Sequence, residues 1–590
     1  MRILGSIKMR VTHLNRFSVL LWGGVILCCC AGASGQVNSW TKRSSGQWHQ
    51  PFWSAGERPS STSHVLFTNA GWKALAVNNV TARNFPGSLS ISNLDVTAPT
   101  RSFNTFMLNH VGVDTPFRVA QNLRLGSNSA LLTLKSALSV GNEFLVDGMV
   151  IHEDSLLTSS RLLHVGNAAS GRYIFNSGHI RAQWLVIGRS CAYTVEMPAP
   201  GVFEQLGGSN YSFGLGIANG AYILRDGQLA TGSTSVSGTN AVFIQSGGAH
   251  TVRYGSAWLR VEGYEDWQRR LVSWATYRLS NGSLLSHVVR LHNAEFSQSG
   301  GTNRVSGTLL LSHDASTRRT SYQLFAGNLI TTTSRVYGAG SAVIVQSGGS
   351  HIIAEKLELD PPYDTHAVVS EDLGVRYRLQ GGNLSAREIR VSTNSIFRHT
   401  AGAIMGSPTL TLAGGIWESA AGQHQFGSLK LIASTRDSTL LLPESSVTLQ
   451  FSHVPPFSFY WDAWARFVVQ NWRGSAAGGG AHQIVFGTNG SGLTPPQLAR
   501  IRFYNPVGFP EGEYAATLLD TGEIVPLAPT GRAPSITYQQ TSSRLQLTWP
   551  LGYTLQTATN IAGPFADVNT NSPYTLDTTA EPQRFFRFRQ

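Results

Sequence analysis

Two histidines in the middle of the chain stand where they could ligate a metal. His250 and His351 each lie two residues after a Gly-Gly pair, and imidazole is a common ligand of transition metals. In two sibling segments the same position holds Asn210 or Asn303. Asn and His are both enriched where the backbone takes a positive φ, and no Asp, Cys or second His recurs at ligand spacing. The pattern therefore predicts a turn role for this position and no metal.

Clustered carboxylates are the second candidate chemistry, because polysaccharide hydrolases and lyases use paired acids or acids that bind calcium. The candidates lie in the longer connections between strand-like segments: Glu262, Glu265 and Asp266; Asp360 and Asp364; and Glu371 with Asp372. None of them alternates along a strand, where two side chains would project from one face. We interpret them as solvated loop charges, with an acid pair as the alternative.

Other catalytic signatures do not occur in the sequence. There is no Gly-x-Ser-x-Gly, no His-Glu-x-x-His and no catalytic-cysteine context. We therefore assign no catalytic residue, no cofactor-binding residue and no metal-binding residue.

Tryptophans near the start of the chain offer a third possibility. Trp40, Trp48, Trp53 and Trp72 fall within residues 36 to 110, a stretch that reads as alternating strands and loops. Tryptophans scattered in this way are mostly core residues, which predicts a cap over the first layer of a repeat array. The alternative is a platform on which glycans stack.

The elements that would position these side chains are repeated. One unit reads aromatic-x-apolar-x-x-Gly-x-aliphatic, and it starts at Tyr173, Tyr222, Tyr277, Tyr322 and Tyr377. A second unit reads Phe/Ile-x-Gln-x-Gly-Gly and starts at Phe203, Phe243, Phe296 and Ile344, with a degraded copy at Phe397. The two units alternate every twenty to thirty residues.

The period-2 spacing inside each unit indicates a strand, and the glycines indicate the turn that follows it. A unit this short cannot bury its apolar face alone, whereas parallel stacking of neighbours buries one continuous core. The sequence therefore predicts an all-β parallel β-helix, or β-solenoid, with Leu224, Leu279, Leu324 and Leu379 inside. Ten or so coils at ~4.8 Å each would make a rod on the order of 50 Å long between about residues 165 and 410. Unequal repeat spacings place insertions in loops.

Composition supports a packed, exported protein. The 590 residues have only 13% charged side chains and a formal net charge of +12. Residues 1–35 combine an acid-free basic start with an apolar run and small residues, which predicts a signal peptide. Its removal leaves 41 basic against 33 acidic residues, a net charge of +8, and Cys191 as the one remaining cysteine. We expect no disulfide, no transmembrane segment after signal removal and, because basic residues never cluster, no nucleic-acid partner.

The segment that follows the repeats carries specific motifs. It contains Asn471-Trp472-Arg473-Gly474, the loop Gly478-Gly479-Gly480, the helix signal Leu493-Thr494-Pro495-Pro496-Gln497-Leu498 and the ending Gly522-Glu523-Ile524-Val525-Pro526. Thr494 suits a helix N-cap and Pro495 the first helical position. Over about ninety residues this segment resembles the C-terminal part of exported bacterial β-solenoid proteins with autotransporter-associated β-strand repeats, of verrucomicrobial type.

That resemblance implies a passenger-like β-solenoid and no known catalytic residue. Together with the repeats, it divides the chain into a signal peptide (1–35), an N-terminal cap with the first coils (36–164), solenoid repeats (165–439), a C-terminal solenoid end segment (440–530) and a small β-rich module (531–590). The expected function is non-catalytic: a structural, adhesive or surface-presentation role in a bacterial envelope or matrix, outside the cell or on the outer-membrane surface. Its expected partners are polysaccharide or cell-surface components. The alternatives are a carbohydrate-active β-helix enzyme, a lyase or hydrolase, and a glycan-binding module.

Overall fold

The computed structural model describes residues 35–189, 200–238, 240–253, 257–263, 265–266, 271–272, 274–313, 320–338, 342–360, 375–452, 454, 461–527, 535–550, 552–568, 570–579 and 583–589. Residues 1–34 of the expected signal peptide lie outside this set, as do Cys191, Asp364, Glu371 and Asp372.

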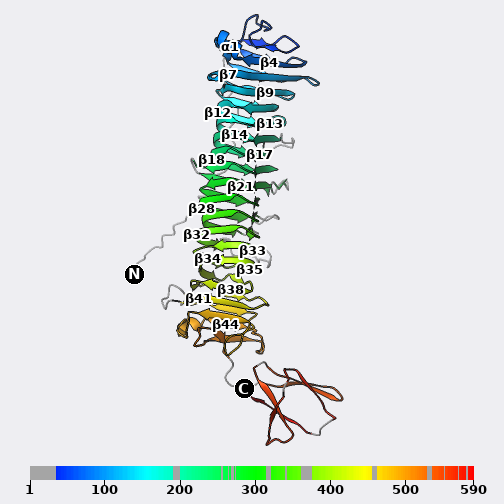
Figure 1. Cartoon of the computed structure of the whole chain (residues 1–590), viewed down its shortest axis with the longest axis vertical. Coiled ribbons are helices and arrows are strands. Elements are labelled where there is room, and N and C mark those ends of the chain that lie inside the picture. Colours follow the sequence, from blue (N-terminus) through cyan, green and yellow to red (C-terminus); the bar gives the residue numbers. More distant parts are fainter. Residues whose placement is uncertain are drawn as a thin grey trace, which may run out of the picture.

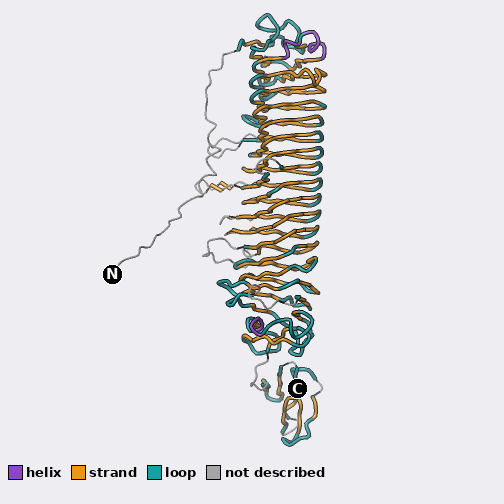
Figure 2. The backbone as a smooth tube through the Cα atoms, turned by 90° about the vertical axis from the view of Figure 1, so that its left-hand side faces the viewer, coloured by secondary structure: helices purple, strands orange, loops and turns teal. Residues whose placement is uncertain are grey.

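The chain forms a long rod of stacked strands (Figures 1 and 2). One sheet of 41 strands runs through the rod, and its neighbours are paired in parallel from β1 (Val37–Ser39) to β44 (Ile501–Tyr504). In the repeat region most strands hydrogen-bond to their counterpart one coil away and not to their neighbour in sequence, as in β15–β17 (Gly201–Gln205 with Gly220–Leu224). This arrangement confirms the predicted all-β parallel solenoid.

A coil consists of one short strand and one long, bent strand. In β16 (Ser209–Ile217) the pairing with β18 (Gln228–Ser237) runs from Ser209 to Ser212 and resumes at Gly214, so the bend lies at Phe213. The short strand and the two halves of the long strand thus give the rod three faces. We call the outward surface of the first halves, residues 178–182, 209–212 and 228–231 in three successive coils, the middle face.

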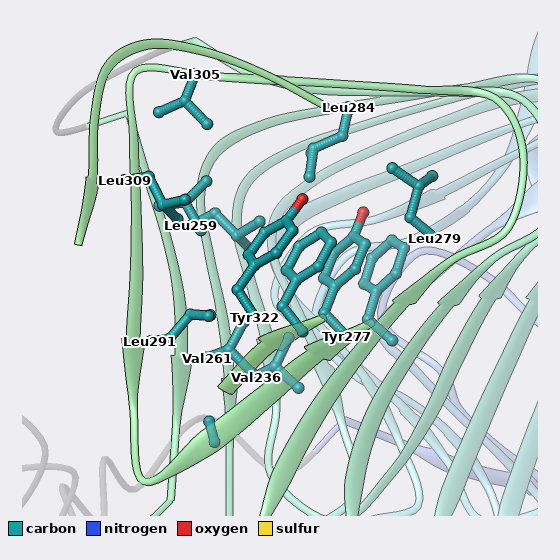
Figure 3. Close-up of a cluster of buried hydrophobic side chains, with 14 of the residues drawn as sticks. Val236, Leu259, Val261, Tyr277, Leu279, Leu284, Leu291, Val305, Leu309 and Tyr322 are labelled. Carbon is teal, nitrogen blue, oxygen red and sulfur yellow. The ribbon is translucent and has the colours of Figure 1, made fainter. Parts of the chain in front are cut away.

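The two repeat units are the same position in alternate coils. The short strands of eight successive coils are β13 (Gly171–Phe175), β15, β17, β19 (Ala241–Gln245), β24 (Ala275–Leu279), β27 (Ala294–Gln298), β29 (Thr320–Leu324) and β31 (Ala342–Gln346). In the next two coils the first parts of the longer strands β33 (Val375–Ser385) and β35 (Ile396–Met405) take this position. In register, Tyr222 pairs with Phe203 on one side and Phe243 on the other. The ring centroids of Phe243 and Tyr277 are 4.5 Å apart and their planes are nearly parallel. Figure 3 shows the rings of Tyr277 and Tyr322 in this column, surrounded by aliphatic side chains.

The predicted core leucines Leu224, Leu279, Leu324 and Leu379 are fully buried. Each lies in register with a glutamine or histidine of the adjacent coils, as Leu324 does with Gln298 and Gln346. The core therefore alternates between an apolar and a polar coil.

Insertions enter the rod at one corner, between the end of a long strand and the next short strand. The connection is two residues from β16 to β17 but runs from Glu262 to Ala275 between β21 (Trp258–Glu262) and β24. Connections of similar or greater length follow β14 (Gly178–Ile187) and β32 (Ser350–Leu359). The strands keep their pairing across these connections, which confirms that length variation lies outside the core.

The N-terminal end of the rod is closed by irregular structure around tryptophans. Trp40, Trp48 and Trp53 are buried, and their rings meet edge to face at about 5 Å. The surrounding elements are β2 (Gly46–Gln47), β3 (His64–Phe67), β4 (Trp72–Asn78), α1 (Asn79–Asn84) and η1 (Pro86–Leu89). The next coils contain β7 (Phe103–Val119), β9 (Ser129–Val140), β11 (Met149–Glu153) and β12 (Ser155–Val165).

The C-terminal end of the rod contains the motifs that carry the family resemblance. The helix α2 (Pro495–Leu498) begins after the N-cap Thr494, and β44 follows it, as the sequence predicts. Here β45 (Glu513–Leu518) and β46 (Ile524–Pro526) turn antiparallel to the stack. The antiparallel strands end the parallel pairing, which protects the last coil from adding a further strand.

Residues 535–589 form a separate small unit with its own core of Leu547, Trp549 and Leu555. It has two three-stranded antiparallel sheets, made of β47 (Thr537–Gln540), β48 (Arg544–Thr548) and β51 (Tyr574–Asp577), and of β49 (Thr554–Ala558), β50 (Ala566–Asp567) and β52 (Phe585–Arg589). In the part of the chain that the structure describes, no helix has the length and apolarity that a bilayer crossing needs.

Candidate functional site

The histidine and asparagine position is a buried strand position and not a turn, so the turn prediction is wrong. Asn210, His250, Asn303 and His351 lie on strands and have at most 1% exposure. The residue with the left-handed backbone is the glycine two places earlier, such as Gly248 at φ 61°. A Cβ at Gly248 would lie 2.6 Å from the Gly227 carbonyl oxygen, so the turn requires glycine itself.

These polar side chains form one hydrogen-bonded set in every second coil. The Tyr277 hydroxyl donates to Gln245 Oε1 at 2.8 Å and contacts His250 Nδ1 at 3.0 Å. Gln245 Nε2 donates to the carbonyl oxygens of Gly248 and Ser283, which ties the turns of two adjacent coils together. The same set recurs with Tyr222, Gln205 and Asn210; with Tyr322, Gln298 and Asn303; and with Tyr377, Gln346 and His351.

The set determines the protonation of both histidines. The Tyr277 hydroxyl donates its one hydrogen to Gln245. His250 Nδ1 must therefore carry a hydrogen and donate it to the tyrosine oxygen. His250 Nε2 then accepts from Thr234 Oγ1 at 3.1 Å, and His351 Nε2 accepts from Ser334 Oγ at the same distance. Burial lowers the pKa of His250 and of His351 to about 3. Both rings are therefore neutral parts of the core, with no free lone pair for a metal.

Acid should weaken the coils that contain these histidines. Their folded-state pKa of about 3 lies below the unfolded value of about 6.5, so between these values the unfolded chain binds more protons. Stability must then fall with pH, by up to about 1.4 kcal/mol per pH unit for each ring. We expect the double variant His250→Asn, His351→Asn to lose less stability than the parent between pH 7 and pH 4, measured by urea unfolding. Asparagine already fills this position at Asn210 and Asn303. Equal losses in parent and variant would contradict the assignment.

The structure separates the candidate carboxylates. Glu262 is the last residue of β21, on a strand and not in a loop as predicted, because the insertion begins only at Gly263. Its Oε1 lies 3.6 Å from Arg290 Nε. Asp360 follows β32 at the same corner, where it accepts from Arg335 Nη2 at 2.9 Å and from Ser392 Oγ at 3.0 Å. Four coil steps separate β21 from β32, about 19 Å, and a glycosidase pair needs about 5–10 Å. Glu265 and Asp266 form β22 (Glu265–Asp266), which pairs with β23 (Leu271–Val272) in an antiparallel hairpin within the insertion.

Carboxylates are not confined to insertions, contrary to the sequence interpretation. Glu204 projects outward from β15 between Arg172, at 3.0 Å, and Arg225, at 2.7 Å. The hydrogen bond from Arg225 is the main cause that holds its pKa below the ordinary value. Glu358 contacts Lys356, and Glu418 accepts from Arg398 of the preceding coil. These acids pair with bases of the same or an adjacent coil, because register places them side by side.

One further acid has the raised pKa typical of a proton donor, but it is enclosed. Desolvation raises the pKa of Glu523, and its Oε2 accepts from the Gly479 backbone N–H at 2.8 Å. Its Oε1 is buried, and none of the residues that the structure describes donates to it. The glycine loop 478–480 thus wraps a carboxylate of its own chain. We interpret Glu523 as a clamp for this loop, since neither oxygen is open to a substrate.

An aromatic cluster on the surface of the rod escaped the sequence analysis. Tyr211 and Phe213 of β16 are 40% and 46% exposed, and Trp184 of β14 is 37% exposed. Tyr211 and Phe213 border a shallow hollow of about 350 Å³, whose other walls are formed by Thr158, Ser159, Arg181, Ala182 and Gln183, and Trp184 contacts Phe213 beside it. We call this the aromatic hollow. Its signal in the sequence is the aromatic pair Tyr211-Ser212-Phe213, which follows the Gly-Gly unit in this coil and in none of its siblings.

Of the four tryptophans named from the sequence, three are buried and one is exposed. Trp40, Trp48 and Trp53 are core residues, whereas Trp72 is 76% exposed and stacks on Phe103 at 5.7 Å. Within the described residues, no group of three His, Cys, Asp or Glu side chains is placed to hold a metal ion. Comparisons of the chain with protein-family models, with curated proteins and with solved structures give no match.

Proposed function

We propose that this protein is an exported, non-catalytic β-solenoid with a structural, adhesive or surface-presentation role in a bacterial envelope or matrix. The observation that carries the proposal is the unbroken core. The aromatic column continues from Tyr173 to Trp417, with ring centroids 4.2–5.1 Å apart except where Ile344 replaces a ring. A catalytic solenoid diverts part of its repeat to hold reacting groups together. In this rod the repeated aromatic positions stack on one another inside the core.

The outward charges support the same proposal. Glu204, Glu262, Asp360 and Glu418 each contact an arginine, so each of these carboxylates is already engaged in an ion pair. At Glu204 the hydrogen bond from Arg225 lowers the pKa, which opposes general-acid chemistry. The resemblance to exported proteins with autotransporter-associated repeats supports the extracellular or outer-membrane location. Glycan binding is the second candidate function, and the aromatic hollow favours it.

A panel of immobilised polysaccharides tests this function. The purified chain without its leader is scored for retention on each polymer and for sugar released into solution. We expect retention on at least one polymer and no release. Release by the parent that disappears when Glu262, Asp266, Asp360 and Asp364 are replaced by Gln or Asn would instead identify an enzyme.

Export makes a separate prediction about the mature N-terminus. The basic start and apolar run of residues 1–35 should direct cleavage after Ala33 or Gly35, so the exported chain should begin at Ser34 or Gln36. Peptide mass spectrometry of protein recovered outside the cytoplasm checks this. Peptides that retain Cys28 to Cys30 in that material would contradict the cleavage.

A further inference from the structure

The aromatic hollow differs from the rest of the middle face. Tyr211 lies in an outward column whose members in register are Thr158, Arg181, Ala230 and Thr251. Small residues therefore follow Tyr211 in the next two coils, and a threonine lies two coils before it. Tyr211 is 40% exposed and forms part of the wall of the hollow. Exposed aromatic side chains gathered around a concavity mark a binding surface more often than isolated ones do.

The rings are held in place before any ligand arrives. Trp184 and Phe213 meet edge to face, with centroids 6.0 Å apart. The Trp184 ring covers Gly214, where a Cβ would lie 2.1 Å from a ring carbon. Any larger residue at 214 would push the indole away from Phe213. Rings fixed in this way lose little conformational freedom on binding.

The polar wall of the hollow is rich in donors. Thr158 and Gln183 offer a hydroxyl and an amide group, and Arg181 offers a guanidinium. The Ser159 hydroxyl is buried and donates to the Leu162 carbonyl oxygen at 3.0 Å, so it is not available to a ligand. Arg181 is exposed and has no ion pair among the described residues, unlike Arg172 on β13 and Arg225 just after β17, which both pair with Glu204. An unpaired guanidinium beside a hydroxyl, an amide and aromatic rings suits a ligand that carries carboxylates, hydroxyls and flat apolar C–H faces.

We propose that the aromatic hollow binds a segment of an anionic polysaccharide, with a uronate carboxylate on Arg181 and a sugar ring against Tyr211 and Phe213. A pyranose ring presents axial C–H groups on one face and hydroxyls at its rim, which matches an aromatic wall opposite polar side chains. The positive balance of the chain attracts such a polymer over a longer range. This inference rests on the proposed surface-presentation function and names its ligand class.

Binding of sodium polygalacturonate, measured by biolayer interferometry, tests the site. We expect the variant Tyr211→Ala, Phe213→Ala to bind about tenfold more weakly than the parent, and Arg181→Gln to lose affinity together with part of the sensitivity of binding to salt. Phe325→Ala and Arg304→Gln are the matched controls. Phe325 is 47% exposed and lies outside the hollow, and Arg304 is an exposed arginine of the same outward column, several coils away. Both controls should bind as the parent does.

Three results would overturn the site. Equal affinity of the parent and the Tyr211/Phe213 variant would show that the rings make no contact. Equal loss in Arg181→Gln and Arg304→Gln would indicate diffuse attraction, and equal affinity for dextran and polygalacturonate would exclude the uronate contact. Far-ultraviolet circular dichroism of each variant confirms that the rod is intact. Sugar release contradicts the non-catalytic function and leaves the site standing, so the two failures are distinguishable.

Discussion

An aspartate at Leu324 is expected to open the middle of the rod. Leu324 is fully buried on β29, between Gln298 and Gln346 of the adjacent coils. The glutamine amides donate to backbone carbonyls, as Gln298 does to Gly301 and Asn328, so they have no hydrogen to spare for a carboxylate. An unpaired buried charge costs about 3–5 kcal/mol. Because each coil contacts only its neighbours, the loss should remain local.

Limited proteolysis followed by mass spectrometry measures this loss. Cleavage should appear in residues 294–346 of the variant, while the coils before Phe203 and after Phe397 stay resistant. Gln323→Asp is the matched control, since its side chain lies on the outward side of the same strand and should be tolerated. If Leu324→Asp resisted protease as well as Gln323→Asp does, the inward register of β29 would be wrong.

Removal of the Tyr277 hydroxyl should weaken two coils at once. In Tyr277→Phe, Gln245 Oε1 loses its donor and His250 Nδ1 loses its acceptor, and both remain buried. Each orphaned group costs about 1–3 kcal/mol. Hydrogen exchange of backbone amides in residues 241–285 should rise, whereas Tyr504→Phe at an exposed tyrosine should leave it unchanged.

The same coil offers a rescue. The coils on either side already place leucine at the two polar positions, as Leu224 and Leu229 do before it and Leu279 and Leu284 after it. Adding Gln245→Leu and His250→Leu to Tyr277→Phe removes both orphaned groups, but it also removes the hydrogen bonds of Gln245 to Gly248 and Ser283. The triple variant should therefore exchange more slowly than Tyr277→Phe, although not as slowly as the parent. Exchange that stays fast in the triple variant would show that the polar set specifies the packing of the core in some further way.

The sequence was sufficient to predict the solenoid because its signal is repetition. Tyr, Leu and Gly recur at fixed offsets, and only stacked parallel coils bring such positions into contact along one column. The same offsets correctly placed Leu224 and Leu379 inside. The offsets did not show which coil contacts which. The two repeat units could therefore be recognised, but not the hydrogen bonds by which the glutamine of one coil joins it to the next.

The polar residues were harder to interpret for a physical reason. A buried His or Asn is acceptable only when a partner exists, and the partner of His250 is Tyr277, 27 residues away in the next coil. From the sequence alone, the adjacent glycines suggested a turn. The aromatic hollow is likewise assembled from β12, β14 and β16, with Trp184 and Phe213 brought together only by stacking. Composition and periodicity characterise each strand separately, so they do not reveal a site that is formed by side chains of several strands.

The proposed site and the proposed non-catalytic function together predict that an anionic polysaccharide is bound and is not cleaved. Light scattering on a mixture of the protein with sodium polygalacturonate reports complex formation and the mass of the polymer in the same sample. We predict that the complex forms and that the polymer, recovered after dissociation in high salt, keeps its original mass after prolonged incubation. A polymer mass that falls with time in the parent, but not when Glu262 and Asp360 are replaced by Gln and Asn, would contradict the account.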